Sequence, residues 1–178
     1  MFIDKTGFFM HPVVRRTWAP RGRTPVLRQR TRHHRKVSTI GGISISPHRR
    51  RLGWYLQFHT DQAIRQEQVL VFLRYWLAHL RGHVIVVWDR LGAHRGSLVR
   101  RYPRGQRRLT LEELPPYAPE LNPNEYGWSH LKYGALANFA PRHLDELEDR
   151  VFLAAHQART RPALLRSFVH ATRLPIRR

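Results

Sequence analysis

The first sixty residues of the chain carry short stretches in which apolar side chains alternate with polar or small ones. Such a period of two is typical of strands, because successive side chains of a strand point to opposite faces of a sheet. Residues 37–46 and 52–59 show this alternation most clearly, and the basic turn at 47–51 between them completes a predicted β-hairpin. Residues 2–3 form a shorter apolar strand that ends at Asp4.

A period of three to four residues replaces the alternation after residue 60. Thr60 or Asp61 can cap a helix whose apolar positions recur as far as Leu80, and Gly82 supplies its stop. The run at residues 83–88 then has the length and composition of a strand that is buried on both faces. It ends at a second carboxylate, on residue 89.

Prolines and capping residues divide the second half of the chain. A short helix near residues 93–102 and a strand near 108–112 precede the prolines of segment 114–119, which exclude a helix there. Asn122 followed by a proline then has the pattern of a helix N-cap and first helical residue. A last helix is predicted over residues 144–158.

The predicted elements follow one another as strand, hairpin, helix, strand, helix, strand, helix and helix. This order favours a three-layer α/β fold, a ribonuclease-H-like mixed sheet flanked by helices. The length of 178 residues and the hydrophobic content of 42% suit one domain, with a core over about residues 1–160 and a C-terminal extension at 161–178.

Three absences from the sequence exclude further classes of protein. There is no cysteine, which excludes disulfides, a thiol nucleophile and a cysteine-based zinc site. There is also no secretion signal and no apolar run of about 18 residues, so we expect a cytoplasmic protein without a membrane partner.

Net charge changes this picture most. The chain has 32 Lys and Arg against 12 Asp and Glu, a formal net charge of +20, which is typical of a protein that binds a polyanion such as nucleic acid. The alternative is a charge that merely solubilises the protein or reflects a GC-rich genome. Nine of the cations lie in residues 15–36, together with two prolines and one glycine. The candidate DNA contacts in this segment are Arg21, Arg23, Arg28, Arg30, Arg32, Arg35 and Lys36.

Three carboxylates occupy positions that a sheet and a helix can bring together. Asp4 and Asp89 follow strands, and Glu125 lies in the first turn of the helix after the next strand. If the first and fourth strands are neighbours, these groups converge at one edge and could hold two Mg²⁺ ions for phosphoryl transfer. Each also has an ordinary alternative: Asp4 as a solvated terminal acid, Asp89 as the cap of a turn, and Glu125 as the capping-box partner of Asn122. Spacing alone does not decide between these interpretations.

Four segments of the sequence narrow the choice. They are FIDKTGF at residues 2–8, TWAPRGRTP at 17–25, VVWD at 86–89 with His94 five residues later, and LPPYAPELNPNE at 114–125. In this order they resemble the mariner superfamily of transposases, in its bacterial insertion-sequence branch. The last segment is highly specific, whereas the first Asp motif alone would be weak.

The resemblance implies a ribonuclease-H-like domain that cuts and rejoins DNA with two divalent ions, Mg²⁺ or Mn²⁺. It implies that Asp4, Asp89 and Glu125 are the catalytic metal ligands, and the 35 residues between the last two (125 − 89 − 1) match the family's usual separation. The chain departs from the family at Lys5, where an acidic residue commonly follows the first Asp, and at Arg90, where Asn is common. Neither departure removes a ligand.

Further candidates surround the three carboxylates. Lys132 lies seven residues after Glu125 and so falls on the same helix face, where it can reach a scissile phosphate or be an ordinary exposed lysine. His94 can orient a carboxylate or contact DNA, or it is a structural hydrogen-bonding residue. Asn122 is a supporting residue at the start of the helix, and Trp128 is expected in the core.

The sequence therefore predicts the catalytic domain of a DNA transposase, which cuts a phosphodiester with metal-activated water and then joins the freed 3′-hydroxyl to target DNA. The alternatives are a non-enzymatic nucleic-acid-binding remnant of a transposase and a ribonuclease-H-like nuclease. Metal-dependent nicking of a duplex would separate the remnant from the two enzymes.

Partners follow from the same prediction. We expect double-stranded DNA, both transposon ends and target, in the nucleoid of a bacterial cell, and a homodimer is a further candidate assembly. The family usually carries helix-turn-helix modules before the catalytic domain, but only residues 1–3 precede Asp4 here. We therefore expect an upstream helix-turn-helix polypeptide to supply the recognition of transposon ends.

Overall fold

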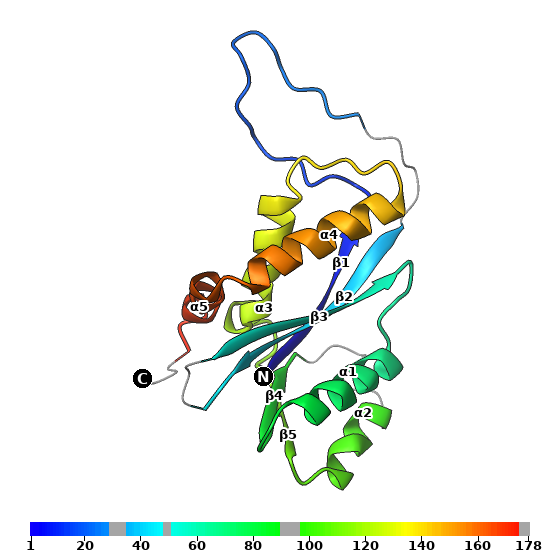
Figure 1. The fold of residues 1–178 in the computed structure, drawn as a ribbon, viewed down its shortest axis with the longest axis vertical. Helices are drawn as coiled ribbons and strands as arrows, with labels where there is room; N and C mark the ends of the chain where they lie inside the picture. Colours follow the sequence, from blue (N-terminus) through cyan, green and yellow to red (C-terminus); the bar gives the residue numbers. More distant parts are fainter. Residues whose placement is uncertain (29–34, 48–50, 90–96, 175–178) are drawn as a thin grey trace.

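A five-stranded mixed sheet forms the centre of the molecule in the computed structural model, which describes residues 1–28, 35–47, 51–89 and 97–174 (Figure 1). The strand order is β3-β2-β1-β4-β5. β1 to β3 are antiparallel neighbours, while β4 pairs in parallel with both β1 and β5. The strands are β1 (Phe2–Phe9), β2 (Lys36–Ile45), β3 (Leu52–Thr60), β4 (Val84–Trp88) and β5 (Leu109–Glu113). The predicted hairpin is β2 and β3. β1 and β4 are neighbours, which is the condition under which the three carboxylates were expected to converge.

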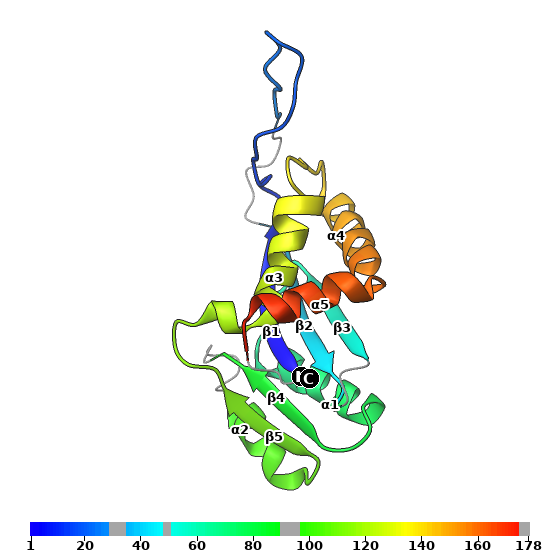
Figure 2. The ribbon, with the colours of Figure 1, turned by 90° about the vertical axis from the view of Figure 1, so that its left-hand side faces the viewer.

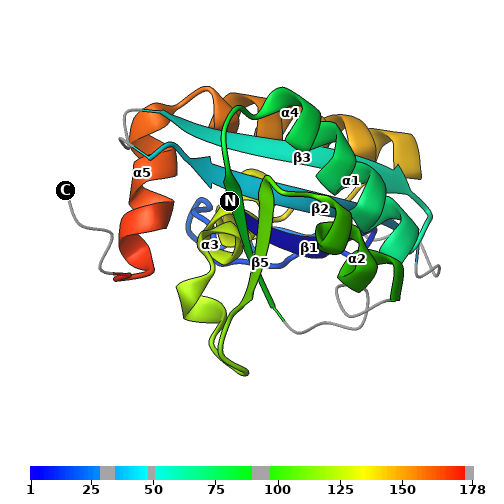
Figure 3. The same ribbon diagram turned by 90° about the horizontal axis from the view of Figure 1, so that it is seen from below.

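Helices cover both faces of this sheet, which confirms the predicted ribonuclease-H-like class. On one face, α1 and α2 pack over Ile3, Ile40 and Val86 in one hydrophobic core. On the other face, α3, α4 and α5 enclose a second core around Trp54 and Trp128, and Figures 2 and 3 show the two layers from the side and from below. The helices are α1 (Gln66–His79), α2 (Ser97–Arg101), α3 (Pro123–His130), α4 (Leu144–Arg159) and α5 (Pro162–Ala171).

The start of α1 differs from the prediction. Thr60 still belongs to β3, and Asp61 adopts a positive φ of 53°, so neither residue caps the helix. The N-cap is Arg65, whose backbone N–H donates to the side chain of Gln68. The chain needs these extra residues to leave the sheet edge and to turn back across its face before the apolar period can begin.

The end of α3 also differs from a simple helix. The α-helix ends at His130 and continues as a π-helical turn over Leu131–Ala135, in which the N–H of Leu136 donates to the carbonyl of Leu131 at 2.9 Å. Apolar spacing predicts one continuous helix here because a single π turn shifts the side chains by only one position. Before α3, the predicted helix near residues 93–102 is described only from residue 97, as α2 and a following 3₁₀ turn at Tyr102–Gly105.

The segment after residue 160, predicted as an extension, begins with α5 and contributes to the second core. Leu165 and Phe168 of α5 are buried, and the ring of Phe168 lies edge-on to Trp54 with 5.8 Å between centroids. In the part of the chain that the structure describes, no helix is long and apolar enough to cross a membrane.

A long arm leaves the sheet between β1 and β2. The described residues 14–28 of this arm are exposed, and Figures 1 and 2 show them projecting beyond the end of β1. The base of the arm is fixed: the backbone N–H of Arg15 donates to Asn138 Oδ1 at 2.7 Å, and its guanidinium donates to the carbonyl of Tyr133 at 2.8 Å. Val13 forms an isolated bridge with Ala137 at the same place.

Candidate active site

The pairing of β1 with β4 brings the first two candidate carboxylates to one level. Phe2 is the register partner of Val87 in this parallel pair. Asp4 and Asp89 each lie two residues further along in the same direction, so they reach the same edge of the sheet. Asp89 is partly buried where β4 ends, and the next described residue after it is Ser97.

The proline-rich loop after β5 brings the third carboxylate to the same place. Glu125 lies in the first turn of α3, and it lines one hollow of about 540 Å³ together with Asp4 and Asp89. The remaining lining residues belong to the loop and the helix cap: Leu114, Pro115, Pro116, Tyr117, Ala118, Pro119 and Asn122. The structure therefore brings the three predicted carboxylates and the supporting Asn122 together.

The local contacts exclude two of the ordinary alternatives, those for Asp4 and for Glu125. Asp4 is only 3% exposed, so it is not a solvated terminal acid. The backbone N–H of Asn122 donates to the carbonyl of Pro119 at 2.9 Å, which occupies the group that a capping box would offer to Glu125. The Asn122 side chain caps α3 by accepting from the N–H of Asn124 at 3.1 Å.

Asp4 has an unusual environment for a carboxylate. Its Oδ2 accepts a hydrogen bond from the indole N–H of Trp128 at 2.9 Å, and its Oδ1 accepts one from the backbone N–H of Lys5 at 2.8 Å. Burial, and then the negative charge of Glu125, raise the pKa of Asp4 from 3.8 to about 7, although the two hydrogen bonds oppose this shift. Asp89 adds a smaller contribution in the same direction as burial.

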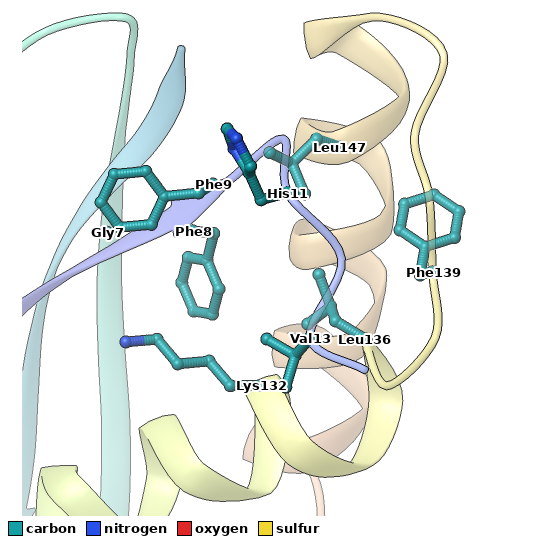
Figure 4. A pocket seen from close by; sticks show the side chains of 9 residues that line it. All are labelled: Gly7, Phe8, Phe9, His11, Val13, Lys132, Leu136, Phe139 and Leu147. Carbon is teal, nitrogen blue, oxygen red and sulfur yellow. The ribbon is translucent and has the colours of Figure 1, made fainter. Parts of the chain in front are cut away.

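Lys132 lies beside the carboxylates and is half-buried. Its ammonium group donates to the Thr6 hydroxyl at 2.5 Å and lies 5.7 Å from the ring centroid of Phe8. Figure 4 shows its aliphatic stem running along a small apolar hollow of about 120 Å³ next to Phe8. It is therefore not an ordinary exposed lysine, and burial lowers its pKa while Glu125 and Asp4 act in the opposite direction.

Glu125 is influenced by the same neighbours. Partial burial of its carboxyl group raises its pKa, the ammonium of Lys132 opposes that effect, and Asp89 adds to it. The side chain as a whole is exposed at the mouth of the hollow. Three carboxylates and one lysine thus lie close together on a protein whose overall charge is +20.

The donor set suits a divalent metal ion in its chemistry, although a formed site is not present among the described residues. Across residues 1–28, 35–47, 51–89 and 97–174, no three His, Asp or Glu side chains are arranged to hold a metal ion as they stand. Oxygen donors of this kind are nevertheless the ligands of Mg²⁺ and Mn²⁺, and a cation would offset the burial and the repulsion from Glu125 that raise the pKa of Asp4. Glu125 is exposed and Asp89 is partly buried, and both line the same hollow as Asp4.

The predicted DNA-binding residues of the arm that the structure describes do not line this hollow. Arg21, Arg23 and Arg28 are exposed along the arm. Arg35 instead forms an ion pair with Asp61 at 3.0 Å. Three of the predicted residues, Arg30, Arg32 and His94, lie outside the described residues, as does Arg90. Lys36 is partly buried, and its ammonium lies 5.8 Å from the ring centroid of Phe9.

Two residues that touch the site were missed as such. Trp128 was predicted only as a core residue, and Asn124 was not singled out. Asn124 is fully buried, and its amide donates to the carbonyl of Phe2 at 2.9 Å, which ties the start of α3 to β1. The signal that could have found both is the spacing of four between hydrogen-bond donors at positions 124, 128 and 132.

A comparison with protein families decides the identity of the domain. A family model described as DDE superfamily endonuclease matches residues 1–148, which include the three carboxylates. The chain belongs to the DDE superfamily of endonucleases. A search of curated proteins by sequence finds no match.

Several solved structures that are similar to this chain are transposase complexes. The mariner Mos1 paired end complex with Mg is 15% identical to this DDE endonuclease, with a TM-score of 0.63 over 98% of this chain and 53% of that chain. A pre-cleavage Mos1 transpososome gives 14% identity and a TM-score of 0.59, with 96% of this chain and 55% of that chain covered. The Mos1 strand transfer complex gives 16% and 0.54, with 99% and 56% covered. The likeness shows a common ribonuclease-H-like fold, and this chain spans slightly more than half the length of those proteins.

Proposed function

We propose that this chain is the catalytic domain of a DNA transposase, which carries out metal-dependent phosphodiester cleavage and strand transfer. The observation that carries the proposal is that Asp4, Asp89 and Glu125 line one hollow of a DDE endonuclease fold. The similarity to Mos1 complexes supports transposition as the setting, because those structures are a transpososome and a strand transfer complex.

In this proposal the three carboxylates hold two Mg²⁺ or Mn²⁺ ions. Bound ions of this kind stabilise negative charge on a phosphoryl group and lower the pKa of coordinated water. The protein's own contribution is to fix Asp4 through its two hydrogen bonds and to place Asp89 and Glu125 on the same hollow. Lys132, whose ammonium group donates to the Thr6 hydroxyl, would contact a phosphate oxygen beside the ions.

Double-stranded DNA is the proposed substrate, and the arm is the proposed second contact with it. Exposed arginines match the geometry of phosphates, and the net charge of +20 favours a polyanion. Phosphate contacts give affinity without choosing a sequence, so recognition of transposon ends requires base-reading contacts in addition. A helix-turn-helix polypeptide, a homodimer and a location in the bacterial nucleoid remain predictions beside this proposal.

Plasmid nicking in the presence and absence of divalent metal tests the proposal. The wild-type chain should nick supercoiled DNA with Mg²⁺ or Mn²⁺ and not with EDTA, and Glu125→Gln should remove the activity. Glu120→Gln is the matched control, because Glu120 is an exposed acid five residues earlier that does not line the hollow. Binding of DNA without any metal-dependent nicking would instead favour the non-enzymatic remnant.

A further inference from the structure

Helix α3 and strand β1 are joined by three evenly spaced hydrogen bonds. Asn124 Nδ2 donates to the Phe2 carbonyl at 2.9 Å, and Trp128 Nε1 donates to Asp4 Oδ2 at 2.9 Å. One step further, Lys132 Nζ donates to Thr6 Oγ1 at 2.5 Å. The donors are four residues apart and the acceptors two residues apart.

The spacing of this ladder follows from the two geometries. Four residues of helix rise about 6 Å, and two residues of strand rise about 6.6 Å. A helix that runs beside a strand can therefore repeat the same contact at every fourth residue. The middle hydrogen bond of the three joins Asp4, a candidate metal ligand, to Trp128, whose side chain does not bind metal ions.

We infer that Trp128 is a positioning residue, which orients the Asp4 carboxylate toward the metal ions through its indole N–H. This inference rests on the proposed function of Asp4 as a metal ligand. A carboxylate has about four lone-pair sites on its two oxygens. Trp128 and the Lys5 N–H take up one site on each oxygen, and the remaining ones are left for the hollow that Asp89 and Glu125 line.

The chemistry of the indole suits this role. An indole N–H donates and neither accepts a hydrogen bond nor carries a charge. It can therefore fix the direction of Asp4 without neutralising it, whereas a lysine or arginine at the same place would compete with a metal ion for the carboxylate. Trp128 is 2% exposed, so water does not replace the hydrogen bond.

The neighbouring strand leaves room for this ring. Gly41 of β2 is the register partner of Asp4, and a Cβ on Gly41 would lie 2.5 Å from Cη2 of the Trp128 ring. The ring thus fills the volume that a side chain at position 41 would occupy, directly beside the carboxylate. Its centroid also lies 5.6 Å from that of Trp54, which packs against the ring.

The variant Trp128→Phe tests the inference, because it keeps an aromatic ring in the core and removes the N–H. The affinity of the full chain for Mn²⁺ should fall at least about tenfold in this variant. The loss of the free Mn²⁺ signal in electron paramagnetic resonance measures this binding. The Mn²⁺ concentration for half-maximal nicking should rise by a similar factor, with nicking largely restored at saturating Mn²⁺.

Trp54→Phe is the matched control. It removes an indole N–H from the same core, but this one donates to Asn124 Oδ1 at 3.2 Å and not to Asp4. We expect Mn²⁺ binding within about twofold of wild type in this variant, and melting temperatures of the two variants within a few degrees of each other. Unchanged Mn²⁺ binding in Trp128→Phe, or an equal loss in both variants, would overturn the inference and leave Trp128 as a packing residue.

A second measurement needs no substitution of Trp128 and covers the case in which that variant does not fold. The indole N–H resonance of Trp128 should move strongly on Asp4→Asn, while that of Trp54 stays near its place; a Trp128 resonance that does not move overturns the inference. A wild-type chain that neither binds Mn²⁺ nor nicks DNA contradicts the proposed function and this inference together. A wild-type chain that does both, with Trp128→Phe behaving like wild type, contradicts this inference alone.

Discussion

The two ends of β1 differ in almost every physical respect. At its beginning, Asp4 is 3% exposed and hydrogen-bonded through both oxygens, and one of these hydrogen bonds comes from Trp128 of α3. Beyond its other end, the arm carries its cations into solvent, and Trp18 is 99% exposed. Cleavage of a phosphodiester requires groups held in fixed directions, whereas contact with a long charged polymer requires reach and charge. One strand thus joins a rigid region suited to chemistry with an extended region suited to binding.

The largest expected effect separates these two tasks. Asp89→Ala or Glu125→Ala should reduce metal-dependent nicking by about a thousandfold or more, because each removes a ligand of the metal ions. These ions would stabilise the negative charge of the transition state by several kcal/mol. Asp4→Ala should act in the same way. Duplex affinity, measured by fluorescence anisotropy, should stay close to wild type in all of these variants, since the arm is untouched. A large parallel loss of affinity would show that the two regions are not separable.

A second prediction concerns the cost of holding Asp4 in the core. Its pKa in the folded protein is about 7, above the ordinary 3.8. Between pH 3.8 and pH 7, Asp4 therefore keeps its proton in the folded protein and loses it in the unfolded chain. The free energy of unfolding of the metal-free chain should therefore fall as the pH rises from about 4 to 7 and stay low above that, by an amount on the order of a few kcal/mol.

Asp4→Asn should remove this pH dependence and raise the free energy of unfolding at pH 8. Its amide oxygen can still accept from the indole of Trp128. Denaturant titrations at several pH values in EDTA measure the effect, and Asp149→Asn, at an exposed position of α4, is the control. Equal pH dependence in wild type and Asp4→Asn would contradict the prediction.

The arm gives the third prediction. Replacement of Arg21, Arg23 and Arg28 with Ala should weaken binding to unrelated duplexes by a similar factor. The same variant should reduce the slope of log affinity against log salt by up to about 2.7, three phosphate contacts at about 0.9 each. The control removes three exposed arginines near α1 and α2 instead, at Arg65, Arg81 and Arg104. If both triple variants lower the slope equally, the arm has no special part in DNA binding.

The smallest expected effect concerns the base of the arm. Asn138 has a positive φ of 58°, so Asn138→Gly keeps the backbone conformation and removes only the oxygen that accepts the Arg15 N–H. We expect a loss of about 1 kcal/mol in the free energy of unfolding. Trypsin should also cut faster at the arm's arginines, as shown by mass spectrometry of the first fragments. Cleavage at the wild-type rate would mean that this hydrogen bond does not hold the arm.

Local patterns predicted most of the sheet. The period of two over residues 37–46 and 52–59 and the apolar run at 83–88 correspond to β2, β3 and β4, because burial of one or both faces imposes these patterns directly. The start of α1 was wrong, because the path of residues 61–65 depends on how the chain leaves the sheet edge. Apolar periodicity likewise gives no sign of the π turn after His130.

The site was predictable to a different degree. Spacing left Asp4, Asp89 and Glu125 undecided, and the resemblance of whole motifs brought them together as a hypothesis. The parallel register of β1 and β4 places the two aspartates at one hollow, and the start of α3 places the glutamate there. The spacing of four between positions 124, 128 and 132 is the only local signal of the role that we assign to Trp128, since a buried tryptophan on a helix is usually explained by packing alone. Its hydrogen bond to Asp4 depends on a strand that lies 124 residues earlier in the chain.

The matched spacing of the hydrogen bonds between α3 and β1 restricts which insertions and deletions the domain tolerates in evolution. Deleting or inserting a single residue between Asn124 and Trp128 would rotate every later side chain of the helix by about 100°. The indole and the ammonium would then leave their acceptors on β1 at the same time. The arm is under no such restriction, because an exposed loop tolerates changes of length at little cost in free energy. Variation in length should therefore accumulate between residues 16 and 28, while the stretch from 124 to 132 keeps its number of residues even where the residues themselves change.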